Sequence, residues 1–418
     1  ELCPVALPEN DLPVDIIIGK DVKKEIEGIA ESHLGPRSMT VSEPDTLVAC
    51  GELETVGQGF SLPRHPHADD KTVEHVRHAL SNCSGALAIG SGTVNDLVKR
   101  ASQLNDTPYI VMGTAASMNG YASGIAAILS NGLKTTVPAR PPRAIILDTH
   151  ILANAPPRLT QAGLGDLISK PVSDSDWWLA DQIEGSGYSS LPSQIVDQAV
   201  SKAIESARGL AEGDPTAHGA LGEALILSGV AMVVAGSSSP ASGGEHLISH
   251  LWDMENHSQG KETRLHGAQV GVATCISAAL YHTILATRSP QFCQAQPWSE
   301  VELRIRSEHG PLAAAILEQA KRKHARAAER IETLRDRWPS IRDGLAARRI
   351  PKPDEIRRAL CLAGAPNTLA DLGETRKNAQ RVFRLARDIR DRITVLDLGF
   401  ELGILPGAID DVLDAAGV

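Results

Sequence analysis

The sequence predicts an α/β domain built on a parallel sheet, followed by an all-helical domain. The chain has 418 residues, a length that suits two or three domains. Residues 1–150 alternate short apolar runs with helical patterns, as parallel strands joined by crossover helices do. After residue 150 the strand signals stop and long helical patterns follow. We therefore expect two domains, 1–150 and 151–418.

Six apolar runs in the first domain are expected to be strands. They cover residues 14–18, 38–41, 46–49, 86–89, 109–112 and 144–147. Helical periodicity lies between several of them, for example over residues 21–33 and 71–81. The Pro141-Pro142 pair cannot continue a helix, so we expect a turn there, beside the domain boundary.

The second domain shows helical periodicity only. The expected helices cover residues 193–212, 217–234, 267–285 and 312–337. The apolar run 221–236 contains Glu223 and several Gly and Ser residues, and it is shorter than the ~20 apolar residues of a membrane span. We interpret it as a buried helix. The charged run 326–332 is expected to be a solvated helix face with i,i+4 ion pairs.

The composition argues against several classes of partner. Hydrophobic residues make up 42% and charged residues 22%, which is typical of a globular protein. The net charge of −10 and the 3% aromatic content argue against a nucleic-acid ligand. The start of the chain shows no signal-peptide pattern, and we expect no membrane association. A homo-oligomer is compatible with the composition, although no isolated apolar stripe identifies an interface.

The cysteines indicate a reducing compartment. None of the six forms a CxxC pair, so neither a zinc ribbon nor a thioredoxin-type site is expected. Sparse, unpaired cysteines in a large chain fit the cytosol. We therefore expect a cytoplasmic protein. The cysteines are Cys3, Cys50, Cys83, Cys275, Cys293 and Cys361.

Two loops of small residues each follow an expected strand. The first, Gly90-Ser-Gly-Thr-Val-Asn-Asp96, lets backbone N–H groups at a helix start approach a phosphate closely. It is not GxGxxG, because Asn95 stands where the third Gly would be. The second loop covers residues 113–123. Ligands gather beyond the carboxyl ends of parallel strands, so both loops could line one site. Ordinary connections without a ligand are the alternative.

A histidine cluster is the strongest chemical signal in the chain. His246 and His250 are four residues apart and would share one face of a helix, and His266 follows sixteen residues later. Two imidazoles with one carboxylate, such as Asp166, form a recurrent catalytic zinc arrangement, and the same donors suit nickel or iron(II). The pattern is not HExxH, because Glu245 precedes His246. Structural histidines are the alternative interpretation.

At these motifs the chain resembles the glycerol-1-phosphate dehydrogenase family, within the iron-containing alcohol dehydrogenase and dehydroquinate-synthase-like group. The resemblance runs from about residue 14 to at least residue 280. It implies a Rossmann-like dinucleotide-binding domain over 1–150, a helical metal- and substrate-binding domain over 151–418, and an active site in the cleft between them. The motifs that match in order cover residues 90–96, 114–121, 162–167, 240–246 and 265–271.

The resemblance also implies roles for individual residues. The residues that would hold the cofactor pyrophosphate are Gly92, Thr93, Val94, Asn95 and Asp96. The nicotinamide half would contact Thr114, Ser117 and Ser123. Glu43 would bond the adenosine ribose and favour NAD over NADP, because a carboxylate repels a 2′-phosphate. The metal ligands would be Asp166, His246 and His266. Asn119, Asp166 and His250 would contact the substrate, with Asp166 and His250 as the catalytic residues.

The expected activity is that of a metal-dependent, NAD(P)-linked dehydrogenase with a small, phosphorylated ketone and alcohol as substrates. Dihydroxyacetone phosphate and glycerol 1-phosphate, or a close analogue, are the expected pair, and zinc is the expected metal, with nickel and iron as alternatives. Two departures affect the substrate: family members mostly carry Asp where this chain has Asn119, and Arg where it has Ser239.

The sequence is also compatible with two other functions. One is a dehydroquinate-synthase-like cyclase or lyase that uses NAD transiently, although only Lys134 and Lys170 are candidates for the basic residues of such a site. The other is a non-catalytic binding protein with the same fold.

Overall fold

Contacts within the chain divide the protein into two compact units. The computed structural model describes residues 12–51, 56–130, 133–261 and 263–418, so Cys3 lies outside the described residues. The first unit comprises Glu1–Leu167, Leu191–Ser237 and Leu362–Gly364, and the second comprises Ile168–Ser190, Ser238–Cys361 and Ala365–Val418. Each unit draws on several stretches of the chain, whereas the predicted domains are single stretches that meet at residue 150.

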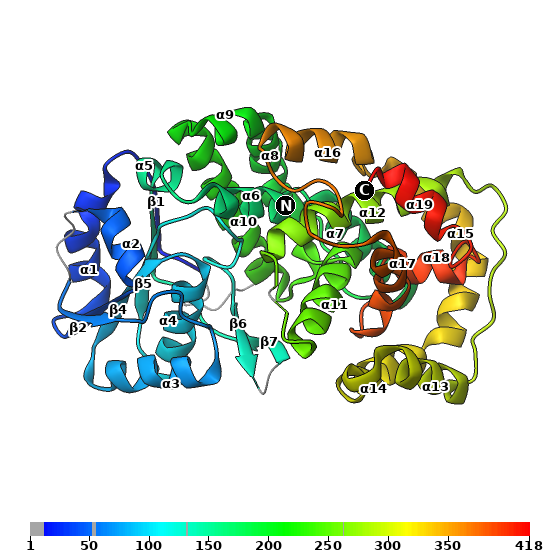
Figure 1. Ribbon diagram of the computed structural model, residues 1–418, viewed down its shortest axis with the longest axis horizontal. Helices are drawn as coiled ribbons and strands as arrows, with labels where there is room; N and C mark the ends of the chain where they lie inside the picture. Colours follow the sequence, from blue (N-terminus) through cyan, green and yellow to red (C-terminus); the bar gives the residue numbers. More distant parts are fainter. Residues whose placement is uncertain (1–11, 52–55, 131–132, 262) are drawn as a thin grey trace. The chain divides into compact units, whose positions relative to one another are not determined.

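The first unit is built on a six-stranded parallel sheet (Figure 1). The strand order is β1-β8-β5-β4-β2-β3, and β6 and β7 form a separate antiparallel pair. The predicted parallel α/β architecture is therefore confirmed, and in the described part of the chain no strand follows β8. The strands are β1 (Asp15–Gly19), β2 (Ser38–Ser42), β3 (Gln58–Ser61), β4 (Gly85–Gly90), β5 (Tyr109–Gly113), β6 (Ile125–Ser130), β7 (Leu133–Pro138) and β8 (Ala144–Asp148).

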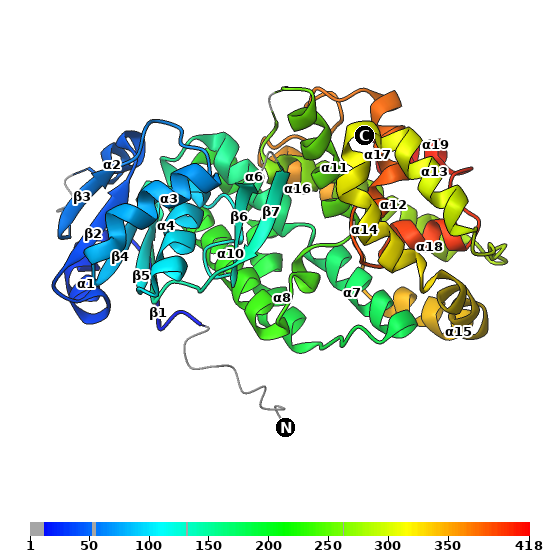
Figure 2. The same ribbon diagram turned by 90° about the horizontal axis from the view of Figure 1, so that it is seen from below.

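Helices cover both faces of the sheet, because successive residues of a buried strand point to opposite faces. In β4, Leu87 and Ile89 pack with the residues of η1, α1 and α2, whereas Ala86 and Ala88 pack with those of α3 and α4. Figure 2 shows α3 and α4 side by side on the second face. The helices are η1 (Val22–Glu25), α1 (Ile26–Leu34), α2 (Pro44–Cys50), α3 (Asp70–Ala79), η2 (Leu80–Asn82) and α4 (Gly92–Asn105).

The strand predicted over 46–49 is wrong, because these residues lie in α2. Pro44 occupies the first turn, where its fixed φ suits a helix and its missing N–H is not needed. The Thr46 hydroxyl accepts a hydrogen bond from the Glu43 N–H at 3.3 Å and donates to the Ile89 carbonyl at 2.8 Å. Local capping therefore outweighs the strand propensity of this short run.

The remaining helices of the first unit pack around one apolar helix, α10. Helix α10 contacts α8 along much of its length (Figure 2). Two helices of the described chain, α10 and α12 (His266–Ala286), are long and apolar enough to cross a membrane, and most of their residues are buried. The expectation of a buried helix over 221–236 is confirmed. The helices are α5 (Thr149–Ala153), α6 (Pro157–Leu167), α8 (Leu191–Glu205), α9 (Ala207–Glu212) and α10 (Pro215–Ala235).

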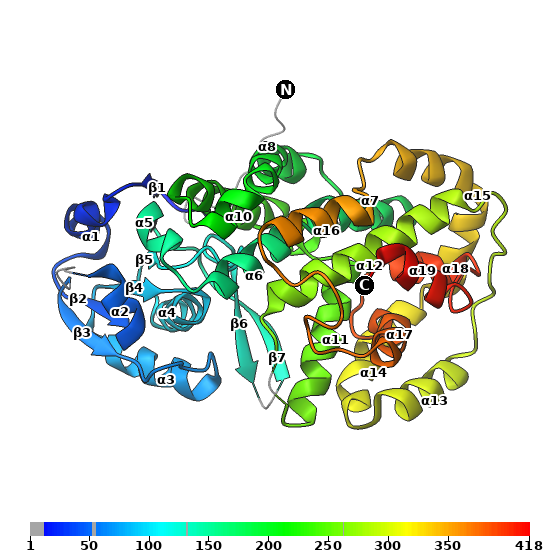
Figure 3. The same cartoon turned by 45° about the horizontal axis from the view of Figure 1, so that its top comes forward.

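The second unit is entirely helical in its described part. Helix α12 contacts α11, α18 and α19 and provides much of the apolar core of this unit (Figure 3). The helices are α7 (Lys170–Glu184), η3 (Ser239–Ala241), α11 (Gly244–Ser258), α13 (Trp298–His309), η4 (Gly310–Leu312), α14 (Ala313–His324), α15 (Ala327–Ala347), α16 (Pro353–Leu362), α17 (Arg376–Leu385), η5 (Ala386–Asp388), α18 (Val395–Glu401) and α19 (Ile409–Ala416).

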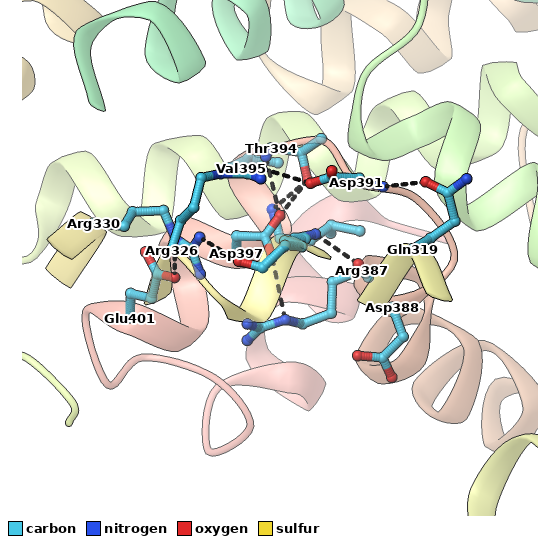
Figure 4. Close-up of polar contacts among 12 residues, drawn as sticks. Gln319, Arg326, Arg330, Arg387, Asp388, Asp391, Thr394, Val395, Asp397 and Glu401 are labelled. Atoms are coloured by element: carbon cyan, nitrogen blue, oxygen red, sulfur yellow. Dashed lines mark hydrogen bonds and ion pairs between the residues drawn. The ribbon is translucent and has the colours of Figure 1, made fainter. Parts of the chain in front are cut away.

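The charged run 326–332 is not simply a solvated face (Figure 4). Its two glutamates are exposed, as expected. The Arg330 side chain is only 2% exposed, however, and its Nε donates to Glu401 at 2.6 Å. Arg326 pairs with Asp391 at 2.5 Å. These partners come from the end of the chain, so the arginines tie α15 to the segment around α18.

Candidate active site

The first small-residue loop joins β4 to α4 in the first unit, as the sequence predicts. Glycine is needed here for close packing: a Cβ on Gly90 would lie 2.5 Å from the Val94 Cβ, and one on Gly92 would lie 2.9 Å from the Met118 sulfur. The first N–H groups of a helix have no partner inside it, and the helix dipole favours an anion there. The start of α4 can therefore bind a phosphate.

The side chains predicted to hold the pyrophosphate divide into two groups. Asn95 is fully buried and its Oδ1 accepts from the Tyr109 hydroxyl at 3.3 Å, while Asp96 Oδ2 accepts from the Ala127 N–H at 3.1 Å. Val94 is also fully buried. Of the five predicted residues, Gly92 and Thr93 at the start of α4 are partly exposed. A pyrophosphate at this turn would meet the backbone and these two residues first.

Glu43 follows β2, which pairs directly with β4, so it lies near the β4–α4 turn. Helices α2 and α4 leave these neighbouring strands toward opposite faces of the sheet, the arrangement that hosts dinucleotides in this class of fold. The Glu43 carboxylate accepts from the His65 N–H at 2.9 Å. The second loop joins the same edge, because the Thr114 N–H donates to the Gly90 carbonyl at 3.1 Å. Ser117, further along this loop, is partly exposed.

A buried lysine that the sequence analysis missed holds this second loop. Lys99 Nζ donates to the carbonyls of Gly120 at 2.5 Å, Ser123 at 2.9 Å and Ile125 at 3.1 Å. Burial lowers the pKa of Lys99 to about 8, although the nearby Asp96 acts in the opposite direction. The Ser123 hydroxyl lies in the same cluster and donates to the Gly120 carbonyl at 3.0 Å, and its predicted nicotinamide contact stays a prediction. A lysine on the apolar face of α4 was the available signal.

Two predicted substrate contacts from distant motifs come together in the first unit. The Asn119 N–H donates to Asp166 Oδ2 at 3.3 Å, across 47 residues of sequence. The Asn119 amide also donates to the Ser228 hydroxyl at 3.3 Å. Asp166 is buried on α6, so its carboxylate is held in place by packing as well as by this loop.

The three predicted histidines come together in the second unit. His246 and His250 lie on α11, and His266 begins α12, which packs against α11. The ring centroids of His246 and His266 are 5.1 Å apart, those of His250 and His266 5.3 Å, and those of His246 and His250 6.0 Å. His257, at the far end of α11, is exposed.

Hydrogen bonds determine the tautomers of two of these histidines. His246 Nδ1 lies 2.8 Å from Glu245 Oε1, and a carboxylate only accepts, so Nδ1 carries the proton. The Ser249 hydroxyl donates to Gln269 Oε1 at 2.9 Å and therefore accepts from His266 Nδ1 at 3.0 Å. In its neutral form each ring therefore has its lone pair on Nε2, the state in which a histidine ligates a divalent metal. The sequence analysis missed Glu245, Ser249 and Gln269 in this role.

A buried acid pair supports the start of α11. Asp176 accepts hydrogen bonds from the N–H groups of Gly244 and Val395, both at 2.7 Å, and from the Tyr281 hydroxyl. Burial and the neighbouring Glu245 carboxylate raise the pKa of Asp176 to about 8, against the effect of these hydrogen bonds. At neutral pH the acid pair therefore prefers to retain one proton, and it holds the helix that carries the histidines.

The predicted metal ligands are of the chemical types that bind divalent metals. In the described part of the chain, no three His, Cys, Asp or Glu side chains are already gathered as a complete metal cage. The imidazoles of His246 and His266 in the second unit are ligand types that zinc, nickel and iron(II) accept, and so is a carboxylate such as that of Asp166 in the first unit. A hollow of about 760 Å³ beside β1 and α10, lined by Ile18, Thr149 and Glu223 among others, contains none of the predicted site residues.

Comparison with known proteins places these features in a family. The family described as iron-containing alcohol dehydrogenase matches residues 50–156. A glycerol-1-phosphate dehydrogenase (NAD(P)+) from Bacillus velezensis is 33% identical over 299 residues, which are 67% of this chain and 76% of the relative. One of the same name from Bacillus subtilis is 30% identical over 406 residues, 93% of this chain and 92% of the relative. This match extends into the last hundred residues.

Solved structures share the fold. A probable glycerol dehydrogenase from Sinorhizobium meliloti has a TM-score of 0.64 at 16% identity and covers 97% of this chain and 98% of its own. The NADH-dependent butanol dehydrogenase A of Thermotoga maritima has a TM-score of 0.59 at 15% identity, with 97% of both chains covered.

Proposed function

The chain belongs to the glycerol-1-phosphate dehydrogenase family, and from that premise we propose that it reduces dihydroxyacetone phosphate, or a close analogue, to the corresponding alcohol. The protein is an NAD(P)-linked, metal-dependent oxidoreductase. In the balanced reaction, the ketone takes a hydride from NAD(P)H and a proton from the protein or solvent, and the alcohol and NAD(P)+ leave. The proposal is carried by the His246 and His266 pair, whose tautomers both leave the lone pair on Nε2.

His246 and His266 would hold the divalent cation through Nε2, with Asp166 as the third predicted ligand. When bound, such a cation supplies Lewis acidity toward the carbonyl oxygen of the substrate. Glu245 and Ser249 orient the two imidazoles by their bonds to Nδ1. We propose zinc as the metal, with nickel and iron as the alternatives that the same donors accept.

His250 is the proposed proton donor for the developing alcohol. It lies one helical turn from His246 and its ring stacks on that of His266, with centroids 5.3 Å apart. Asn119 contributes by holding the Asp166 carboxylate through its backbone N–H. In the first unit, the start of α4 would bind the pyrophosphate, and we propose NAD as the preferred cofactor because Glu43 follows β2.

We also propose a cytosolic location and small-molecule partners only, without nucleic acid or membrane. All five cysteines that the structure describes are free thiols, as expected in a reducing compartment. The proposal includes a homo-oligomer and assigns no interface to it.

The test is NADH oxidation with dihydroxyacetone phosphate, using protein loaded in turn with zinc and with nickel, and with NADPH in parallel. We expect oxidation that a chelator abolishes. His266→Ala should lose both metal and activity while its circular dichroism stays unchanged, and His257→Ala, at the exposed end of α11, is the matched control. A metal-replete and active His266→Ala enzyme contradicts the site. Wild-type protein that binds metal and NADH but reduces no ketone phosphate contradicts the function.

A further inference from the structure

The segment that joins α17 to α18 alternates arginines and aspartates, and the acids are already paired. Asp388 accepts from both terminal nitrogens of Arg304, at 2.8 and 2.9 Å. Asp391 pairs with Arg326 at 2.5 Å (Figure 4). Neither acid forms a hydrogen bond or ion pair with Arg390 or Arg392 in the described structure.

Two arginines of this segment have no acidic partner. Arg392 donates to the Ser242 carbonyl and, at 2.9 Å, to the Ser238 hydroxyl, both neutral acceptors. Arg390 is partly buried and forms no hydrogen bond or ion pair with any residue that the structure describes. Burial lowers the pKa of both guanidinium groups, and the charge of Arg390 lowers that of Arg392 further. Two cations thus lie near each other with their charge only partly compensated.

Two carboxylates act on Arg392 by their charge without pairing with it. Glu245 and Asp176 raise the pKa of Arg392 by their charge, so they are close enough to act on it. Both are already bonded to backbone N–H groups at the start of α11, and neither is within ion-pair distance of Arg392 in the described structure. They offset part of the positive charge without filling the donor positions of the guanidinium groups.

The arginines lie beside the turn that leads into the histidine helix. Ser242, which Arg392 binds, is four residues before His246. Lys170 Nζ donates to the Ala241 carbonyl of the same turn at 3.2 Å. Lys170 and Arg392 thus bind two successive carbonyls of this turn. Segment η5, which precedes Arg390, packs against α11. The arginine pair is therefore beside the start of the helix that carries two of the predicted histidines.

We propose that Arg390 and Arg392 bind the phosphate group of the substrate. Guanidinium forks match phosphate oxygens in geometry, and charge-assisted hydrogen bonds are about twice as strong as neutral ones. A phosphate monoester dianion would supply the negative charge that Asp388 and Asp391 do not. This proposal rests on the proposed function and deepens it, because it assigns the residues that distinguish a phosphorylated ketone from a plain one.

The first test compares dihydroxyacetone phosphate with dihydroxyacetone in wild-type enzyme and in Arg390→Gln. Arg390 is chosen because no bond in the described structure depends on it. The ratio of kcat/KM for the two ketones should fall at least about tenfold. Arg358→Gln, an exposed arginine on α16, is the control and should keep the wild-type ratio. An unchanged ratio in Arg390→Gln refutes the proposal, as does an equal loss of NADH affinity, which would place the arginines at the cofactor.

The second test needs no turnover. Calorimetry measures the binding of inorganic phosphate to zinc-loaded wild-type protein and to Arg390→Gln, and Kd should rise about tenfold in the variant. Weakened phosphate binding in a protein that does not reduce dihydroxyacetone phosphate refutes the proposed function but supports the phosphate site. Reduction of that ketone with equal phosphate binding by both proteins refutes the phosphate site and leaves the function intact.

Discussion

Replacing Lys99 by methionine tests how the second loop of the first unit is held. Methionine preserves the length and apolar stem of the side chain but removes the ammonium group. The buried Ser123 carbonyl loses its donor, whereas the carbonyls of Gly120 and Ile125 keep the Ser123 hydroxyl as an alternative donor. Each unsatisfied buried acceptor costs about 1–3 kcal/mol, and the variant avoids the cost of burying a charge. We expect a net loss of about 1–3 kcal/mol in the free energy of unfolding at pH 7.

The pH dependence of this loss gives the sharper test. Burial lowers the pKa of Lys99 from 10.5 to about 8 in the folded protein. Between these values the unfolded chain binds more protons than the folded one, so wild-type stability rises with pH. The penalty for burying the charge is present below pH 8 and is relieved as the pH rises. From pH 7 to pH 9 the gain is about 1.4 kcal/mol, and methionine has none, so the difference between the proteins should widen.

Urea denaturation at pH 7 and pH 9 measures both effects. An unfolding step seen by circular dichroism but not by tryptophan fluorescence belongs to the first unit, because all five tryptophans lie in the second. Lys71→Met, at an exposed position on α3, is the control and should show no widening. A difference that stays constant or narrows between pH 7 and pH 9 refutes the reasoning. The tryptophans are Trp177, Trp178, Trp252, Trp298 and Trp338.

Three further substitutions test other parts of the structure. Glu245→Gln removes the carboxylate that orients His246, and zinc affinity in a chelator competition should fall about tenfold or more; wild-type affinity would contradict this role. In the wild-type protein Lys323 pairs with Asp397 at 2.8 Å, and Asp397→Asn leaves this buried lysine without the carboxylate. The variant should lower the stability of the second unit by about 3–5 kcal/mol, measured by tryptophan fluorescence in urea. An unchanged unfolding midpoint would show that the pair contributes little. Gly90→Ala places a Cβ 2.5 Å from a side chain of α4 and should cost about 1–3 kcal/mol and weaken NADH binding in a fluorescence titration; normal stability would show that the turn can relax.

Much of the fold could be predicted because its signals are local. The apolar runs at β2, β4, β5 and β8 are fully buried strands, and a strand buried on both faces of a parallel sheet is apolar along its length. The apolar run at β1 is a partly exposed strand at the edge of the sheet. Helices α10 and α12 were visible for a similar reason, since core helices are apolar on all sides. Strands β3, β6 and β7 were missed: β3 has four residues and is mostly exposed, and β6 and β7 pair with each other outside the parallel sheet.

The candidate site was partly visible for a different reason. Glycine-rich turns after strands, and histidines four residues apart, are unusual enough to be noticed in a single sequence. The residues that support these motifs are not unusual in the sequence. Lys99, Glu245 and Ser249 are ordinary residue types, and their roles depend on which carbonyls and imidazoles the fold places beside them.

The sequence by itself determined the fold class, the two glycine-rich turns and the histidine cluster, because periodicity and rare residue types are properties of short stretches. The tertiary structure decided that residues 46–49 form a helix, where a contact with β4 supports the local cap. It also decided that Arg330 is a buried partner of Glu401, 71 residues away, and that Arg390 and Arg392 lack acidic partners although aspartates flank them. The energy of a charged side chain depends on the charges and donors around it in space, and sequence spacing does not give those distances.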